Sequence, residues 1–78
     1  MIRQAKEKLT AAKVRKLPEG TRVILHGRDR RGYSTELPCT VAKSYRSKVL
    51  HYLEFDGTTV TKPIRDYPNK YYTREDRS

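Results

Sequence analysis

From Thr21 onward, apolar residues alternate with polar ones in short runs that glycine and proline interrupt. A period of two places the apolar side chains of a strand on one face, whereas a helix needs a period near 3.6. The runs are also of strand length rather than helix length. The sequence therefore predicts strands at residues 21–26, 36–43, 48–55 and 58–62.

The segments between these runs favour reversals of the chain. Residues 27–33 form a basic loop with a glycine near each end, and residues 44–47 are polar. Asp56-Gly57 is a typical hairpin turn, because glycine adopts positive φ without strain. Pro38 has no amide hydrogen, which limits its strand to a sheet edge or places it among the first residues of the strand. These features predict antiparallel strands that are neighbours in chain order.

A chain of 78 residues has room for one domain with a marginal core, since it buries only ~60% of the surface of its unfolded form. We expect one strongly bent sheet that closes on itself, because a small barrel leaves few exposed strand edges. Cys39 is expected to be a small buried hydrophobe, and His51 a histidine of the core or the barrel mouth. The predicted inward-facing residues are Val23, Leu25, Leu37, Cys39, Val41, Val49, Leu53, Phe55, Val60 and Ile64.

The two ends of the chain differ from this central pattern. Residues 2–16 predict a helix, because apolar residues recur there at spacings of three and four: Ile2, Ala5, Leu9 and Ala12. After the last strand, residues 64–67 are expected to form one helical turn. The predicted organisation is a basic N-terminal helix at 1–17, a barrel at 18–67 and a loose polar C-terminal tail at 68–78.

Two motifs resemble known small barrels. Cys39–Lys43 followed by Tyr52–Thr58 resembles the Tudor pattern of a valine-rich strand and then an aromatic residue ahead of an Asp-Gly hairpin. Pro18–Val23 is similar to the glycine-then-basic-valine opening of KOW motifs. The resemblance covers residues 18–66 and implies a mainly β, SH3-like barrel of four to five antiparallel strands preceded by an α-helix. It implies either a nucleic-acid partner or a methylated-peptide partner.

Positive charge is concentrated in the first two thirds of the chain. Residues 1–48 hold thirteen Lys and Arg against four Asp and Glu, whereas residues 49–78 hold five of each sign. The formal net charge of +9 thus comes from the first part alone. Such asymmetry predicts a basic face and favours a polyanionic partner.

Lysines and arginines interleaved with tyrosines favour single-stranded or irregular RNA or DNA, because the cations neutralise phosphates and the rings stack on unpaired bases. We expect the loop at 27–33 and the turn at 44–47 to lie near each other in a barrel. The candidate nucleic-acid-binding residues there are Arg28, Arg30, Arg31, Tyr33, Lys43, Tyr45, Arg46 and Lys48. The predicted helix adds Lys6, Lys13, Arg15 and Lys16.

Two alternatives remain at this point. The basic surface also suits an acidic protein partner of the polymerase or nuclease type, with this chain as an adaptor or inhibitor. A Tudor-like cage for a methylated peptide would need rings converging at a barrel mouth, with Asp56 or Asp66 beside them. The rings available for it are Tyr33, Tyr45, Tyr52, Phe55 and Tyr67.

The sequence offers little for catalysis. One cysteine and two histidines have no metal-ligand spacing, and neither a glycine-rich phosphate loop nor a nucleophile elbow occurs. We therefore expect no enzyme activity, no cofactor, no metal and no small-molecule substrate. No apolar run approaches the ~18 residues of a membrane-spanning helix. The lone cysteine and the lack of a secretory signal favour a cytoplasmic location without a membrane partner.

Overall fold

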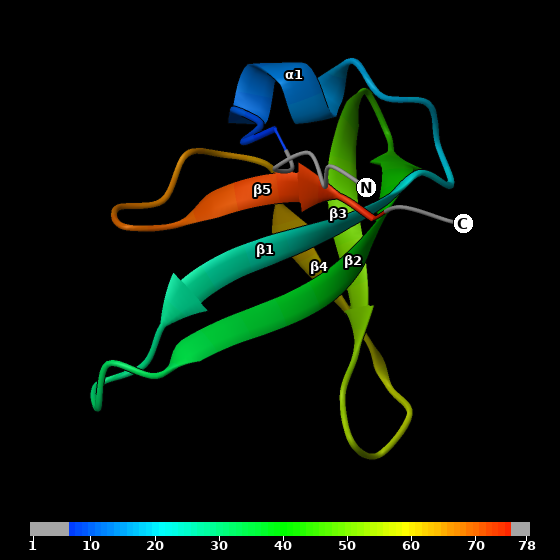
Figure 1. The fold of residues 1–78 in the computed structure, drawn as a ribbon. Helices are drawn as coiled ribbons and strands as arrows, with labels where there is room; N and C mark the ends of the chain where they lie inside the picture. The colour runs from blue at the N-terminus through cyan, green and yellow to red at the C-terminus, as the bar shows by residue number, and fades with distance from the viewer. Residues whose placement is uncertain (1–6, 76–78) are drawn as a thin grey trace, which may run out of the picture.

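The computed structural model describes residues 7–75, and this part of the chain forms one helix and five strands (Figure 1). The elements are α1 (Ala11–Arg15), β1 (Arg22–Arg28), β2 (Ser34–Ser44), β3 (Ser47–Leu53), β4 (Thr59–Pro63) and β5 (Tyr71–Arg74). The strands form a single antiparallel sheet in the order β4-β3-β2-β1-β5. The predicted mainly β fold with a helix before the strands is confirmed.

Strands β1 and β2 have the predicted alternation. Val23 pairs with Cys39 and Leu25 with Leu37, so these four side chains share the core face of the sheet. Val23, Leu25 and Cys39 are buried and Leu37 is half-buried. Val41 and Ile64, two further predicted inward residues, are also buried.

The predicted inward residues of β3 were wrong by one position. The sheet pairs Val41 with Leu50, so Leu50 is the fully buried residue of β3, whereas Val49 lies half-buried on the other face. Leu53 and Phe55 are exposed. Apolar residues occupy both faces of this strand, so alternation alone does not define its register, and a slip of one residue exchanges the faces.

The predicted helix at 2–16 was too long, and its residues 2–6 lie outside the described residues. Leu9 is extended, and its N–H donates to the Tyr72 carbonyl at 2.7 Å. Helix α1 begins after Thr10, whose Oγ1 accepts the Lys13 N–H at 3.3 Å. The Asp66 carboxylate accepts the Ala11 N–H at 3.0 Å. These two side-chain acceptors satisfy amides of the first turn and fix where the helix starts.

The expected loose tail at 68–78 was also wrong for its described part, since residues 71–74 form β5, paired with β1, while residues 76–78 lie outside the described residues. Tyr72 is fully buried in the core and its hydroxyl donates to the Arg65 carbonyl at 2.8 Å, while Thr73 is buried beside it. These β-favouring side chains cover the edge of β1. Residues 64–67 form neither a helix nor a strand, so the predicted helical turn was wrong. The Arg65 carbonyl and the Asp66 carboxylate bond instead to β5 and α1.

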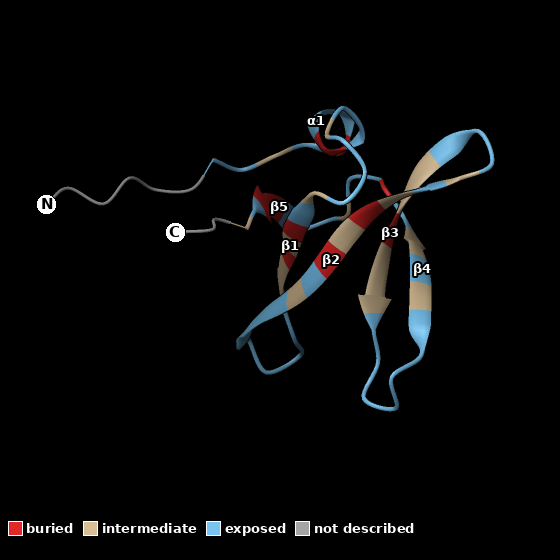
Figure 2. Ribbon diagram, turned by 90° about the vertical axis from the view of Figure 1, so that its right-hand side faces the viewer, coloured by how far each residue is buried: buried red, intermediate tan, exposed pale blue. Residues whose placement is uncertain are grey.

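The sheet does not close into a complete barrel within the described part of the chain. Strands β4 and β5 are its two edges and do not pair with each other. Helix α1 lies over the opening between them, with Ala11 and Val14 buried in the core (Figures 1 and 2). The Arg15 guanidinium bonds to the Ile64 carbonyl beyond β4, and Leu9 pairs with Tyr72 of β5. A short helix therefore connects the two edges where strand pairing would close a barrel.

Replacing Tyr72 with phenylalanine tests the contribution of its hydroxyl. Tyr72→Phe keeps the buried ring but leaves the Arg65 carbonyl without this donor. We expect a loss of about 1 kcal/mol of unfolding free energy. That corresponds to a fall in Tm of about 4–8 °C by thermal melting. Tyr45→Phe is the matched control, because Tyr45 is 98% exposed, and an equal loss in both variants would contradict the assigned bond.

The reactivity of Cys39 tests its burial. Burial raises the pKa of its thiol to about 11, and nearby Lys62 opposes this only in part. Since the thiolate is the reactive form, we expect iodoacetamide to alkylate the folded chain at pH 9 at least about tenfold more slowly than the denatured chain. The folded stability contributed by the neutral thiol is present below its unfolded pKa and is lost as the pH rises toward 11. Equal alkylation rates in the two states would contradict this environment.

Candidate polyanion-binding surface

The two basic loops of the sequence prediction do not share a surface. The β1–β2 loop, with Arg30, Arg31 and Tyr33, lies at one end of β2, and the β2–β3 turn, with Tyr45 and Arg46, lies at the other (Figure 1). Strand β2 has eleven residues. At a rise of about 3.3 Å per residue, its ends are separated by roughly 30 Å if the strand is straight. Successive connections of an antiparallel meander lie at opposite ends, which explains the separation.

The β2–β3 turn lies instead near the end of α1. Lys48 Nζ donates to the Leu17 carbonyl at 2.5 Å, which joins β3 to the segment that follows the helix. This turn-end group consists of Lys13, Arg15, Lys16, Lys43, Arg46 and Lys48. Several of its cations already have protein partners, since Lys13 pairs with Glu7 at 3.0 Å and Arg15 bonds to a carbonyl. Lys6, the remaining predicted site residue, lies outside the described residues.

The β1–β2 loop is an ordered turn that exposes its cations and its ring. Asp29 Oδ1 accepts the amide hydrogens of Arg31 at 2.9 Å and of Tyr33 at 3.0 Å. Gly32 has φ of 86°, a conformation that glycine adopts without strain. The hairpin tip, defined as Arg30, Arg31 and Tyr33, therefore projects from the sheet, and Tyr33 is 69% exposed.

The structure brings together a second set of cations that the sequence analysis did not select. Three of them surround the half-buried ring of Tyr67: Lys62 Nζ lies 4.5 Å from the ring centroid, Arg65 Cζ 5.0 Å and Lys70 Nζ 5.8 Å. Among residues 7–75, none of these three has a carboxylate partner within 4.0 Å. The cluster joins β4 to the connection that precedes β5.

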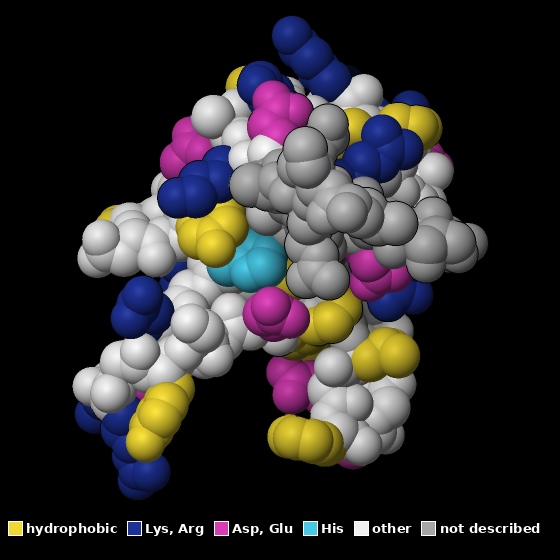
Figure 3. Space-filling view, viewed as in Figure 1, with side chains coloured by type: hydrophobic (Ala, Val, Ile, Leu, Met, Phe, Trp, Pro, Cys, Tyr) yellow, Lys and Arg dark blue, Asp and Glu magenta, His cyan; other side chains and the backbone are white. Residues whose placement is uncertain are grey.

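Lys70 connects this cluster to the β1–β2 hairpin. A Cβ at Gly27 would lie 3.2 Å from Cγ and Cε of Lys70, so the absence of a side chain at Gly27 makes room for the lysine stem. Lys8, Arg28 and Lys70 line a shallow cavity of about 620 Å³. We call Lys8, Arg28, Lys62, Arg65 and Lys70 the cationic band. Figure 3 shows Lys and Arg side chains at the hairpin tip and higher on the same side of the molecule.

The composition of residues 49–78 gives no indication of the cationic band, because this segment contains as many acids as bases. In the structure two of those acids are bound elsewhere. Asp66 accepts the Ala11 N–H, and Glu75 forms an ion pair with Arg22 at 3.2 Å. Lys62, Arg65 and Lys70 of the same segment therefore have no ion pair within residues 7–75. The sequence does not reveal this arrangement, because residues of β4, of the connection before β5 and of the base of the β1–β2 hairpin come together only in the folded chain.

A stacked aromatic pair lies beside the band. The rings of His26 and Tyr71 are parallel within 11° at a centroid distance of 4.7 Å, and Lys8 Nζ lies 4.7 Å from the Tyr71 centroid. Since His26 occupies one face of the Tyr71 ring, Lys8 covers the other. Thr73 Oγ1, 2.7 Å from His26 Nε2, fixes the imidazole. Both faces of Tyr71 are therefore occupied, which leaves Tyr33 as the ring available for stacking on this side.

The rings considered for a methylated-peptide cage do not converge. Tyr33 and Tyr45 lie on connections at opposite ends of β2, and Tyr67 lies among the cations of the band. Tyr52 and Phe55 line a common cavity. Two rings on one hairpin do not enclose an ammonium group, so this geometry does not support a cage.

No group of three or more His, Cys, Asp or Glu side chains within residues 7–75 is arranged to hold a metal ion. The single helix of the described range is neither long nor apolar enough to span a membrane. Comparison of the chain with protein-family models, with curated proteins and with solved structures found no match.

Proposed function

We propose that this protein binds nucleic acid through the phosphates, with the cationic band as the principal contact and the hairpin tip as a second one. The observation that carries this proposal is the gathering of Lys62, Arg65 and Lys70 around Tyr67 without a nearby carboxylate. Three unneutralised cations on a single ring are an arrangement that favours an anion.

Mutual repulsion among the three cations favours the binding of an anion between them. Two like charges about 8 Å apart in water repel each other by roughly 0.5 kcal/mol, and more where protein excludes water. Each phosphate placed among the three cations replaces this repulsion by attraction and releases condensed counterions from the nucleic acid. Backbone phosphates carry no sequence information, so the band favours binding with little sequence preference.

Single strands suit the hairpin tip better than duplexes. Tyr33 is exposed beside Arg30 and Arg31, so an unpaired base can stack on its ring while the arginines contact the flanking phosphates. In a duplex the bases are already stacked on each other and their faces are not accessible. Tyr33 therefore adds affinity only for unpaired bases.

The relationship to Tudor or KOW barrels is part of the same proposal. A small antiparallel sheet of five strands and a turn at Asp56-Gly57, where Gly57 has φ of 84°, are compatible with it. An acidic protein partner would use the same band, because carboxylates and phosphates both pair with lysine and arginine. Measurements of salt dependence and of binding to polyglutamate distinguish a nucleic-acid partner from an acidic protein partner.

Salt dependence tests the band. If about five phosphates are bound, log affinity for oligothymidylate falls with log salt at a slope near −3.5. In Lys62→Gln/Lys70→Gln two of these contacts are lost, so the slope becomes shallower by about 1.4 and binding weakens at every salt concentration. Fluorescence anisotropy over a salt series measures both quantities.

The matched control is Lys16→Gln/Arg46→Gln, which removes the same net charge from the turn-end group. We expect its slope to stay close to that of the wild type. Equal losses in the two double variants would mean that only total charge matters and would refute the band. Binding to polyglutamate but not to oligothymidylate would favour the acidic protein partner.

Replacing Tyr33 tests stacking separately. Tyr33→Ala is expected to weaken binding to oligothymidylate by the ~1–3 kcal/mol typical of one stacked base, which is about 5- to 150-fold. Affinity for a duplex of equal charge should change less than about twofold, because the phosphate contacts remain. Tyr45→Ala, which removes a still more exposed ring at the other end of β2, should change neither affinity. Equal losses on single strand and duplex would exclude a stacking role for Tyr33.

A further inference from the structure

Pro38 opens a groove between the two hairpins of the sheet. The β2–β3 ladder runs from Ser44↔Ser47 to Thr40↔His51, and the next hydrogen-bonded pair in its register would be Pro38 and Leu53. Proline has no amide hydrogen, so this pair would lose one of its two hydrogen bonds. The ladder stops there, and the β1–β2 and β3–β4 hairpins diverge (Figures 1 and 2).

Both walls of the groove have unpaired backbone groups. Ser44 and Ser47 flank a two-residue turn and form a hydrogen-bonded pair, so even-numbered residues of β2 bond toward β3. The Val41 N–H donates to the Thr21 carbonyl on the other side, as this alternation requires. The N–H and C=O of Glu36 and of Leu53 therefore face the groove, and no backbone partner for them lies among the described residues.

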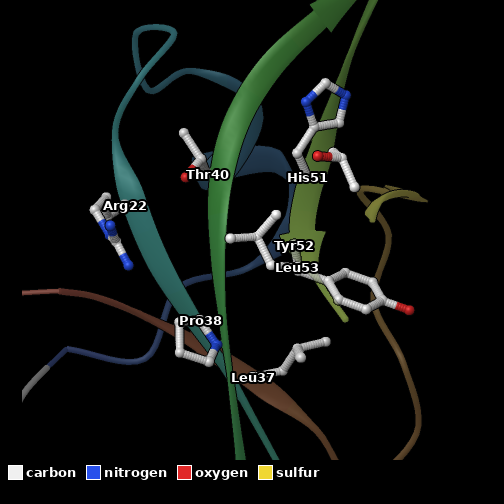
Figure 4. A pocket seen from close by; sticks show the side chains of 8 residues that line it. Arg22, Leu37, Pro38, Thr40, His51, Tyr52 and Leu53 are labelled. Carbon is white, nitrogen blue, oxygen red and sulfur yellow. The ribbon is translucent and has the colours of Figure 1, made fainter. Parts of the chain in front are cut away.

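The lining of the groove is apolar. Two adjoining cavities of about 420 and 440 Å³ share Leu37, Tyr52 and Leu53 as lining residues. Figure 4 shows the labelled side chains around the point where β2 and β3 part. Leu53 is 71% exposed and Phe55 is fully exposed at the rim. Apolar side chains exposed together beside an unpaired strand edge are typical of a binding groove.

The charged groups beside the groove are mainly acidic in a strongly basic protein. Glu54 lines the groove and Asp56 follows in the adjoining turn, while residues 35–42 and 51–61 contain no lysine or arginine. The Glu36 carboxylate is directed elsewhere, 3.8 Å from His26 Nδ1. Arg22 at the end of the groove is paired with Glu75. The Asp56 carboxylate accepts hydrogen bonds from the hydroxyl and the amide of Thr58, which lower its pKa and keep it charged. The groove therefore favours a cationic occupant and repels phosphates.

We infer that this groove binds an extended peptide segment of a partner protein in which lysine or arginine alternates with apolar residues. The peptide backbone pairs with the free N–H and C=O groups of Glu36 and Leu53. Its apolar side chains, which share one face of an extended chain, cover Pro38 and Leu53. Its cationic side chains lie on the other face, which Glu54 shares with Tyr52 because the two residues are two apart at the end of β3. This inference is independent of nucleic-acid binding, which involves the cationic band.

The test uses the full chain without nucleic acid. A blocked heptapeptide of alternating lysine and valine is titrated into isotope-labelled protein, and amide NMR shifts and hydrogen exchange are followed. We expect saturable shifts centred on the amides of Glu36 and Leu53, with slower exchange at both. Glu54→Lys should weaken the peptide Kd at least about fivefold, since attraction becomes repulsion. Leu53→Ser should weaken it similarly without unfolding the chain, because the side chain is 71% exposed.

The controls separate strand pairing from simple charge attraction. Tyr45→Ser changes a ring that is 98% exposed at the far end of β2 and should leave the Kd within about twofold. A heptapeptide with the same side chains but N-methylated at alternate residues keeps the charge and loses the backbone donors, so it should not bind. Equal binding of the N-methylated peptide, or shifts outside residues 34–38 and 52–56, would overturn the inference. Shifts at Glu36 and Leu53 that grow with protein concentration alone would identify a second copy as the occupant and also overturn it.

Discussion

The rest of the structure depends on the burial of one aromatic residue, Tyr72. Its strand, β5, covers the edge of β1, its carbonyl accepts the Leu9 N–H, and its hydroxyl donates to the Arg65 carbonyl. A single fully buried side chain thus joins the segment before α1, the segment after β4 and the C-terminal strand. In so short a chain the core is marginal, and these bonds allow a helix of only five residues to stay in place over the open side of the sheet.

The same connections separate the charges of the protein. Asp66 bonds to the start of α1, and Glu75 pairs with Arg22 at the end of β5. Neither carboxylate forms an ion pair with the cations around Tyr67. Meanwhile the segments on both sides of the groove contain acids and no bases. The net charge of +9 therefore describes the local charge of neither the band nor the groove, because folding places a cationic band and an acidic groove on one small sheet.

Local sequence patterns predicted the parts of the fold that depend on neighbouring residues. Alternation located β1 and β2, and the Asp-Gly pair located the turn before β4, because strand faces and turn conformations are local properties. The inward face of β3 and the existence of β5 depend on pairing with distant strands, so alternation could not define them. The cluster of cations around Tyr67 was not predicted. Lys62, Arg65 and Lys70 gather there only through tertiary contacts, which no local pattern reveals.

Pro38 shows how one residue decides between a closed wall and a binding groove. If its position had an amide hydrogen, the β2–β3 ladder could continue to Leu53, and the free backbone groups of both strands would be paired. Leu53 would then lie opposite position 38 within a regular sheet. Proline prevents this without disturbing the β1 side, where odd-numbered residues of β2 make the bonds. Ending the ladder therefore leaves backbone groups unpaired only between β2 and β3. At that place the sheet exposes apolar side chains and acidic residues together.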